Sequence, residues 1–467
     1  MRRFYCTAGA GMEELLAEEV QQKLCATQVE QIPGRVFFCC DADLYTVTQL
    51  KSAERLFLLL SKAEPISLPK NPAKTAAVVK QRVVGAPEIW KQTLLIWKDL
   101  QEELQCSQQR GHKRRRKDED VEEEEESLTV ADESTHSLTS SSHLTKRQHE
   151  VDKSCQHTPS FRVCCRCSGV IARSYTSQRL SRIIGMAIKE HLGWKVDLRD
   201  PVLEVNVYLS DDHCVVGIPL LKHPLASRSY MKHHGLRSTI AWAMTSLCPK
   251  QLNNCVILDP MCGVGAVLLE AAQEYSNAVF LGMDTDTSQL QKAAENLKAS
   301  GMEGRVQLLR SSAMEIPLSD GAVDAVLCDV PFGRKFSCSS DMSTALPHLL
   351  REMERVICVG GHLVLLLSLQ LSAQLKKTIC THKHNHHLNS SDTNNAHNDP
   401  SNTHNDCTDT PKTLMFNKST SETSNTPLLL SSLQARRTHK VSLGSTDAFI
   451  HTYTKIQTQA HSELAPK

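Results

Sequence analysis

Two turns in the second half of the chain carry residue types that could do chemistry. The first is the run D-P-M-C-G-V-G from Asp259 to Gly265, which follows an apolar run and precedes a helix-like run. Gly263 and Gly265 allow the backbone to approach a ligand closely, where a Cβ atom would obstruct it. About twenty residues later a second apolar run ends in Asp284, where an acid can accept hydrogen bonds from both hydroxyls of a ribose. The spacing predicts a nucleoside cofactor.

The residues around the glycines favour one cofactor over another. The turn lacks the G-x-G-x-x-G spacing of dinucleotide folds, and Asp259 ahead of the glycines would repel a pyrophosphate. The same acid suits the positively charged methionyl moiety of S-adenosylmethionine. We therefore predict that Asp259, Gly263, Gly265 and Asp284 bind S-adenosylmethionine. NAD is the alternative ligand, and an ordinary strand-to-helix turn is the explanation without a ligand.

The second turn, from Asp329 to Gly333, follows another apolar run. It is expected at the carboxyl end of a later parallel strand, where ligands of open α/β sheets collect. The Asp329 carboxylate and a backbone carbonyl held rigid by Pro331 can accept hydrogen bonds from an exocyclic amine. Phe332 offers a face on which a base can stack. Holding the amine in this way aims its lone pair at an electrophilic methyl group. The alternative is a Pro-Gly turn with a core phenylalanine.

The elements expected around these turns belong to an α/β fold. From His223 onward, strand, turn and helix patterns follow one another, which is typical of a parallel sheet. We predict a catalytic domain over 223–380 that is closed by two strands over 436–456. A small α+β region is expected over 160–222, and an N-terminal α+β domain over 1–100.

Two polar segments separate these regions, and both are predicted to be disordered. Residues 101–159 hold a basic block, Lys113–Lys117, followed by an acidic run and a Ser/Thr/His-rich stretch, so little apolar surface offsets the entropy of ordering. The block is either a nuclear localisation signal, a phosphate-binding arm or a charge run. Residues 381–435 are crowded with Asn, His, Thr and Ser, and such tracts seldom bind a metal specifically.

The composition limits the class of protein. The 467 residues include 53 Lys and Arg against 52 Asp and Glu, so any nucleic-acid surface must be local. No apolar run approaches the roughly 20 residues of a membrane helix, and the first residues lack the apolar stretch of a signal peptide. Cys164, Cys165 and Cys167 lack a second ligand pair nearby, so we predict no metal. The 18 scattered cysteines indicate reduced thiols in a soluble intracellular protein.

The two turns also carry a resemblance to a known family. Asp259–Gly265, Asp284 and Asp329–Gly333 resemble motifs I, II and IV of S-adenosylmethionine-dependent amino-methyltransferases. The runs Leu225–Tyr230 and Leu236–Met244 resemble the lead-in of the THUMP-containing guanine-N2 RNA methyltransferases. Other runs resemble the THUMP region of that family or its branch that acts on U6 spliceosomal RNA: Phe161–Gly169, Val215–Leu220, Phe4–Gly9, Lys51–Phe57 and Arg351–Val356. The resemblance covers most of the chain except the two polar segments.

The resemblance implies a Rossmann-like methyltransferase domain preceded by an α+β THUMP-type RNA-binding region. It implies S-adenosylmethionine as cofactor and N2-methylguanosine in U6 RNA as product, with an effect on pre-mRNA splicing. Asp329, Pro331 and Phe332 would be catalytic. Many methyltransferases carry an acid against the adenine amine after the third strand; here Ser312 and Ala313 follow Ser311, and a serine hydroxyl can still accept.

The resemblance further implies a small zinc-containing activator subunit as partner and a location in the nucleus, with the cytoplasm as the alternative. No membrane partner is expected. Two rival functions remain open from the sequence. One is a tRNA guanosine N2-methyltransferase. The other is a noncatalytic RNA-binding protein with a degenerate methyltransferase domain, against which the joint presence of Asp329 and Pro331 argues.

Overall fold

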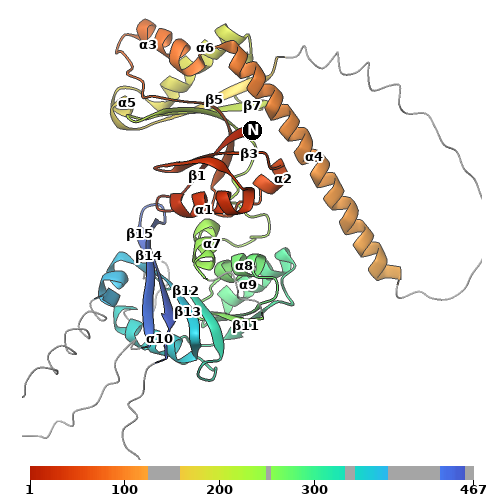
Figure 1. The fold of residues 1–467 in the computed structure, drawn as a ribbon, viewed down its shortest axis with the longest axis vertical. Coiled ribbons are helices and arrows are strands. Elements are labelled where there is room, and N and C mark those ends of the chain that lie inside the picture. The colour runs from red at the N-terminus through yellow and green to blue at the C-terminus, as the bar shows by residue number, and fades with distance from the viewer. Residues whose placement is uncertain (125–157, 249–253, 332–341, 377–431, 458–467) are drawn as a thin grey trace, which may run out of the picture. The chain divides into compact units, whose positions relative to one another are not determined.

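The computed structural model describes residues 1–124, 158–248, 254–331, 342–376 and 432–457. The chain divides into two units, each built on one β-sheet (Figure 1). The first unit comprises Met1–Ser229 and Arg237–Ala243, and the second comprises Tyr230–Leu236 and Met244–Lys467.

The first unit contains an eight-stranded sheet with the order β2-β3-β1-β4-β8-β7-β5-β6. Its strands are β1 (Arg2–Thr7), β2 (Thr27–Ile32), β3 (Arg35–Cys40), β4 (Arg55–Ala63), β5 (Ser160–Cys167), β6 (Lys195–Val196), β7 (Leu203–Leu209) and β8 (Cys214–Pro219). Antiparallel pairing of β4 with β8 joins the N-terminal strands to the later ones. The predicted regions 1–100 and 160–222 therefore share one sheet instead of forming two separate domains.

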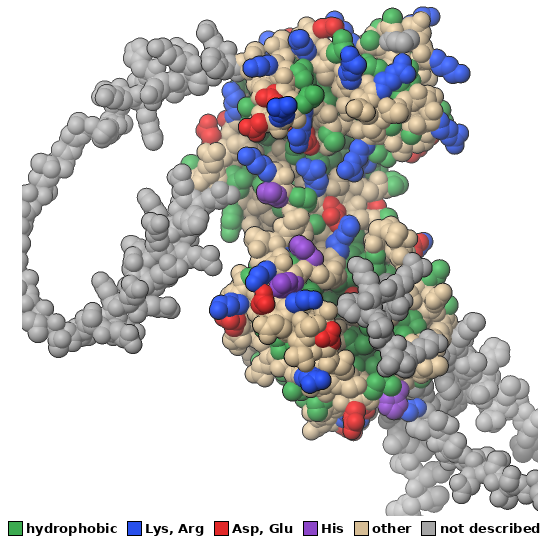
Figure 2. All heavy atoms as spheres, turned by 180° about the vertical axis from the view of Figure 1, so that it is seen from behind, with side chains coloured by type: hydrophobic (Ala, Val, Ile, Leu, Met, Phe, Trp, Pro, Cys, Tyr) green, Lys and Arg blue, Asp and Glu red, His purple; other side chains and the backbone are tan. Residues whose placement is uncertain are grey.

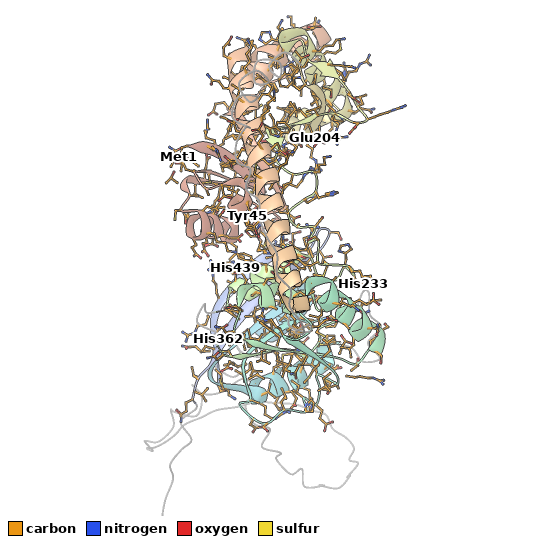
Figure 3. The ribbon with its side chains drawn as sticks, turned by 90° about the vertical axis from the view of Figure 1, so that its right-hand side faces the viewer. Met1, Tyr45, Glu204, His233, His362 and His439 are labelled. Atoms are coloured by element: carbon orange, nitrogen blue, oxygen red, sulfur yellow. The ribbon has the colours of Figure 1, made fainter. Side chains whose placement is uncertain are left out.

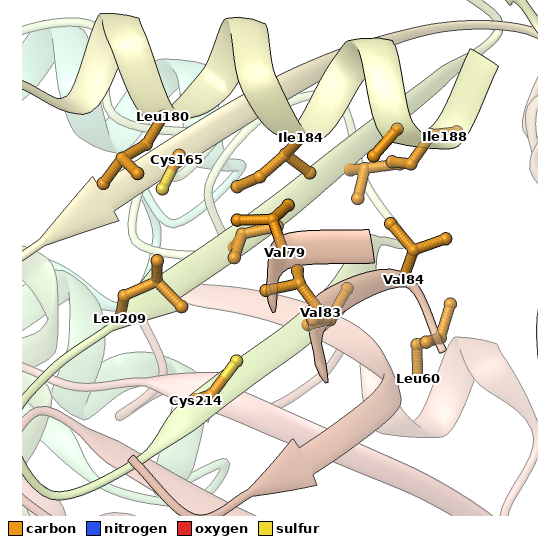
Figure 4. Packing of buried hydrophobic residues seen from close by; sticks show 14 of the residues in the cluster. Leu60, Val79, Val83, Val84, Cys165, Leu180, Ile184, Ile188, Leu209 and Cys214 are labelled. Atoms are coloured by element: carbon orange, nitrogen blue, oxygen red, sulfur yellow. The ribbon is translucent and has the colours of Figure 1, made fainter. Parts of the chain in front are cut away.

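Helices pack against one face of this sheet. They are α1 (Glu13–Leu24), α2 (Leu44–Val47), α3 (Pro72–Val79), the π-helix η1 (Lys80–Val84), α4 (Pro87–Glu124), α5 (Gly169–Ser174) and α6 (Ser177–Leu192). In α6 the hydroxyl of Thr176 accepts from the backbone N–H of Arg179, and Gly193 ends the helix with φ 70°. Between these caps, buried Leu180, Ile184 and Ile188 recur at helical spacing and pack against α3 and η1 (Figure 4).

The second unit contains a seven-stranded sheet with the order β11-β10-β9-β12-β13-β15-β14. Its strands are β9 (Val256–Asp259), β10 (Val279–Asp284), β11 (Val306–Arg310), β12 (Val323–Asp329), β13 (Ile357–Ser368), β14 (Leu433–Ser442) and β15 (Asp447–Lys455). The connecting helices are α8 (Ala266–Glu274), α9 (Thr287–Ser300) and α10 (Met342–Val356), and α7 (Ser238–Ser246) precedes β9. The strands from β9 to β13 are parallel, and β15 and β14 are antiparallel additions, so the prediction of a parallel α/β sheet closed by two strands is confirmed.

The strand order of the second sheet reverses at β9. From β9 the chain proceeds through β10 and β11 to one edge, and it then returns to place β12 on the other side of β9. Ligands of open α/β sheets bind outside the carboxyl ends of the strands at such a reversal. Both turns singled out in the sequence follow β9 and β12, so the fold brings them to the same place.

Several predicted boundaries differ from the structure. Helix α4 continues to Glu124, so the predicted start of disorder at residue 101 is wrong. The first part of this helix is apolar and is anchored by buried Trp90 and Leu100, and the polar part continues from it. The block Lys113–Lys117 falls within this helix. Strand β14 begins at Leu433, before the predicted 436. The remainder of the predicted segments 101–159 and 381–435 lies largely outside the described residues.

No helix in the described part of the chain is long and apolar enough to span a bilayer. Cysteines at fourteen described positions are all free thiols. The three cysteines considered as metal ligands lie on β5, where Cys165 is buried and Cys164 and Cys167 are partly exposed.

Gly217 provides a test of the packing in the first sheet. A Cβ atom there would lie 2.5 Å from Cε1 of Tyr5 and 2.9 Å from the Leu58 carbonyl oxygen. The Tyr5 ring is buried and stacked on Phe57 at 4.6 Å, so it cannot move away. We expect Gly217→Ala to lower the free energy of unfolding by about 1–3 kcal/mol in a denaturant titration. Gly185→Ala, where the nearest atom would be 3.8 Å away within helix α6, is the control and should not destabilise the protein.

Candidate active site

The cofactor turn predicted at Asp259–Gly265 connects β9 to α8. Gly263 and Gly265 adopt φ values of 52° and 79°, in the left-handed region that glycine tolerates and most residues avoid. The turn is fastened to the neighbouring strand because the N–H of Cys262 donates to the carbonyl of Met283 at 2.8 Å, and it is closed by a 2.8 Å bond from the Gly265 N–H to the Cys262 carbonyl. The backbone conformation here therefore favours glycine at both positions.

The surroundings of Gly263 and Asp284 suit a nucleoside cofactor. A Cβ atom at Gly263 would meet nothing within 4 Å, so the turn is open where a ligand must approach the backbone. Asp284 ends β10, and its Oδ2 accepts from the N–H of Gly263 at 2.9 Å while its Oδ1 accepts from the N–H of Asp286 at 2.8 Å. Each carboxylate oxygen keeps a second lone pair. The carboxylate is thus held beside the turn with capacity to accept from ribose hydroxyls.

Asp259 lies deeper than the sequence suggested. Its side chain is 1% exposed, and its Oδ1 accepts from the N–H of Met261 at 3.1 Å. Burial, followed by the nearby charges of Asp329 and Asp284, raises the pKa of Asp259 well above its usual value. The carboxyl therefore shapes the turn from inside, and its predicted contact with a cationic ligand remains a prediction.

Ser312 and Ala313 follow β11, the strand next to the one that ends in Asp284. The N–H of Ser311 donates to the Asp284 carbonyl at 3.2 Å, which holds this segment against the end of β10. The Ser312 hydroxyl accepts from the N–H of Met314 at 3.2 Å, and Ala313 is buried. Both residues thus lie on the strand-end side of the sheet where the adenine was predicted to bind.

Asp329 is the last residue of β12 and is half-buried, as is Pro331 two residues further on. Burial of the carboxyl raises the pKa of Asp329 to about 7. A carboxyl whose pKa is displaced in this way, at the strand-end edge beside a ligand turn, is a candidate for chemistry. Phe332, the third predicted catalytic residue, lies outside the described residues.

Other residues of the site have no counterpart in the sequence predictions. Asn296 on α9 is fully buried and hydrogen-bonds both the cofactor turn and the segment before α7. Glu270 on α8 is also fully buried and accepts from the Tyr230 hydroxyl at 2.8 Å. Their signal in the sequence is weak: a polar residue in the apolar stripe of a helix indicates a buried partner without identifying it. Figure 3 shows His233, which belongs to the same segment.

Metal chemistry has no support in the described residues. They contain no group of three or more His, Cys, Asp or Glu side chains arranged to hold an ion. The histidines at 382, 384, 386 and 387 lie outside the described residues.

Comparison with known proteins agrees with both units. A THUMP domain model matches residues 139–218, and a model described as an RMKL-like methyltransferase domain matches residues 226–393. The chain is 38% identical to the U6 snRNA (guanine-N(2))-methyltransferase THUMPD2 of Homo sapiens, over 97% of this chain and 96% of that protein. It is 27% identical to the tRNA (guanine(6)-N(2))-methyltransferase THUMP3 of Bos taurus, over 77% of this chain and 79% of that one.

The fold has a similar neighbour among solved structures. TrmN from Thermus thermophilus superposes with a TM-score of 0.60 at 19% identity, over 98% of this chain and 100% of that one. A likeness at this identity supports the fold. The similarity to THUMPD2 extends over nearly the whole chain, and a THUMP domain match is followed by a methyltransferase domain match. These findings confirm the resemblance, and the chain belongs to the family of THUMP-containing RNA guanine-N2-methyltransferases.

Proposed function

We propose that this protein is an S-adenosylmethionine-dependent methyltransferase that forms N2-methylguanosine in U6 snRNA. One observation supports it most: two strand ends lie at the reversal of the strand order. One carries the open cofactor turn after β9, and the other is the Asp329-Val330-Pro331 end of β12. The RNA class follows from the relative that covers nearly the whole chain.

The residues that would hold the cofactor are Asp284 at the ribose, Ser312 and Ala313 at the adenine, and the turn of Gly263 and Gly265, whose backbone is open at Gly263. When bound, S-adenosylmethionine supplies an electrophilic methyl group on a sulfonium. The protein's part is to present a nitrogen to that methyl group, to exclude competing orientations and to stabilise the charge that develops.

Asp329 performs the central part of this task. Its ionised carboxylate accepts a hydrogen bond from the exocyclic amine of guanine, and the rigid backbone at Pro331 offers a carbonyl as the second acceptor. Positive charge develops on the nitrogen as the methyl group is transferred, and a carboxylate fixed in a poorly solvated position stabilises that charge. Phe332 would stack on the base. The guanine must be unpaired or flipped out, because base stacking hides its reactive edge in a duplex.

Two further parts of the function rest on the family. A small zinc-containing activator subunit is proposed as partner, and co-purification with the tagged chain tests it. A nuclear location is proposed because U6 RNA is the substrate of the full-length relatives.

The tRNA alternative is favoured by one specific observation, the 27% identity to a tRNA methyltransferase over 77% of the chain. Mass spectrometry of nucleosides in U6 RNA and tRNA from cells lacking the protein separates the two: loss of N2-methylguanosine from U6 RNA alone supports the proposal, and loss from tRNA alone overturns its choice of RNA.

A surface suited to RNA lies on the sheet face of the first unit that carries no helix among the described elements. The registers of β1 to β5, β7 and β8 place six cationic side chains on this face against two acidic ones, Glu30 and Glu204, and β6 adds Lys195 as a seventh cation. The first six are Arg3, Arg35, Arg55, Lys62, Arg162 and Arg166. Figure 2 shows Lys and Arg side chains gathered over the first unit on the side that it views.

The cations of this face are held partly by aromatic rings. The Arg35 guanidinium lies 3.6 Å from the ring centroid of Tyr208, and the Lys62 ammonium lies 4.9 Å from that of Phe37. Acids occupy other donors of this face, because the Lys62 ammonium donates to Glu30 and the Arg162 guanidinium donates to Glu204. Arg3 and Arg166 are exposed on the same face, and exposed guanidinium groups can donate to phosphate oxygens, which supports RNA binding there.

Replacing Asp329 tests the catalytic assignment. We expect Asp329→Asn to lower kcat by about 10²–10³, because a neutral amide does not stabilise the developing charge. In the unmodified protein, burial raises the pKa of Asp329 to about 7, so the carboxylate is the major form only above that pH. The kcat/KM for RNA should therefore fall as pH drops below 7 and level off above it. Activity of Asp329→Asn within twofold of the unmodified protein would contradict the assignment.

Replacing Asp284 tests the cofactor assignment. Asp284→Ala should weaken S-adenosylmethionine binding by about 1.5–3 kcal/mol, measured by calorimetry, while kcat at saturating cofactor changes less. Asp286→Ala is the matched control: that acid caps α9 through the N–H of Ser288, so its loss should affect stability and leave cofactor affinity unchanged. Equal affinity of Asp284→Ala and the unmodified protein would mean that the ribose is held elsewhere.

The RNA surface is tested by charge reversal. The double variant Arg3→Glu/Arg166→Glu should raise the KM for U6 RNA and reduce the salt dependence of RNA binding, because about two phosphate contacts are lost. The kcat at saturating RNA should not change. Arg182→Glu, an exposed position on α6 over the opposite face, is the control. A larger effect of the control than of the double variant would place the RNA elsewhere on this unit.

A further inference from the structure

We propose that the segment Tyr230–Leu236 sets the position of the cofactor turn, with Asn296 as the positioning residue that holds the two together and Gly235 as the contact through which the segment acts. The inference rests on the proposed use of S-adenosylmethionine. The residues that it names contact the cofactor turn and do not contact the reacting atoms. All of them belong to the second unit.

Asn296 joins three parts of the second unit through one side chain. It projects from α9 and is 0% exposed. Its Nδ2 donates to the carbonyl of Val264 at 3.0 Å, inside the cofactor turn, and to the carbonyl of His233 at 2.9 Å. Its Oδ1 accepts from the N–H of His233 at 2.7 Å. A buried amide with both ends occupied fixes the turn and the segment at one distance from each other.

The segment is anchored on either side of this amide. The Tyr230 hydroxyl donates to the buried carboxylate of Glu270 on α8 at 2.8 Å. On α9, Glu295 contacts Nζ of Lys232 at 2.6 Å and Nε2 of His233 at 2.8 Å. The helices α8 and α9 are those that follow the two strands carrying the cofactor residues. The segment is therefore tied to both helices that flank the cofactor turn.

Gly235 brings the segment into direct contact with the turn. A Cβ atom at Gly235 would lie 2.6 Å from Cγ2 of Val264, the residue between the two glycines of the turn. Val264 is 8% exposed, and a valine side chain has few allowed rotamers, so it cannot easily turn aside. A methyl group at Gly235 would push either the segment or the turn. Asn296 binds both parts, and Glu270 and Glu295 bind the segment in addition, so we expect the displacement to fall on the turn at Gly263-Val264-Gly265.

The proposal explains why a fully buried polar side chain is placed in the apolar stripe of α9, beside Ala293 and Leu297. Leaving a buried amide without partners costs more than an apolar residue would at the same position. Its bonds are made to backbone groups of the turn and of the segment, so the side chain fixes main-chain positions that the cofactor would contact. The same position occupied by leucine would pack but would fix neither.

The experiment measures cofactor affinity in variants that change this contact. Gly235→Ala should raise the calorimetric Kd for S-adenosylmethionine about tenfold, with kcat at saturating cofactor close to that of the unmodified protein. The double variant Gly235→Ala/Val264→Ala removes the clashing Cγ2 and should restore the Kd to within about twofold. Gly304→Ala is the matched control, because a Cβ atom there meets nothing within 4 Å, and its Kd should be unchanged. Thermal unfolding without cofactor checks that Gly235→Ala is folded.

Asn296→Asp gives a second, independent readout. It keeps the acceptor to the His233 N–H and removes the donor to the carbonyls of Val264 and His233, so the Kd should rise even where the fold is retained. An unmodified protein that binds no S-adenosylmethionine would overturn the proposed function itself. An unmodified protein that binds, with Gly235→Ala binding equally well, would overturn this inference alone. A weakened Gly235→Ala that Val264→Ala fails to restore would overturn it too, because the contact between the two residues would not be the cause.

Discussion

Parallel pairing of β9 with β10 on one side and with β12 on the other determines where the cofactor turn, Asp284 and Asp329 lie. These pairings align Gly282 with Asp259 and Val326 with Leu258, so the strands end at one edge of the sheet. The turn after β9, the acid that ends β10 and the acid that ends β12 then converge at this edge. Because a single strand is shared by both pairings, a change in the register of β9 would separate the cofactor residues from Asp329.

The convergence has an electrostatic consequence. Asp259, Asp284 and Asp329 are gathered at one sheet edge, and the charges of the latter two add to the effect of burial on the pKa of Asp259. Like charges so close together disfavour the ionised form of Asp259. A ligand with a positive centre relieves that repulsion, whereas the phosphates of a dinucleotide would increase it. The arrangement therefore agrees with a sulfonium cofactor better than with NAD.

The sequence predicted what local signals carry. The turn at Gly263 and Gly265 has its own signature, because glycine adopts the positive φ angles there without strain, and the apolar runs before Asp284 and Asp329 identify buried strands. Contacts between distant residues were not predictable. Nothing in a single sequence links Asn296 to His233, so the hydrogen bonds of this amide appeared only in the structure. The same holds for the pairing of β4 with β8, which joins residues 1–100 and 160–222 in one sheet. The extent of α4 was missed because polar composition, which suggested disorder, does not forbid a helix that begins on a buried apolar stretch.

The central claim is that Asp329 and the cofactor turn act together on the exocyclic amine of a guanosine. The most direct test incubates the purified protein, with its proposed activator subunit, with a U6 RNA transcript and S-adenosylmethionine carrying a deuterated methyl group. Nucleoside mass spectrometry then identifies the product. The account predicts labelled N2-methylguanosine as the product. Label on a different base or a different guanosine atom, or RNA binding without any labelled nucleoside, would contradict it.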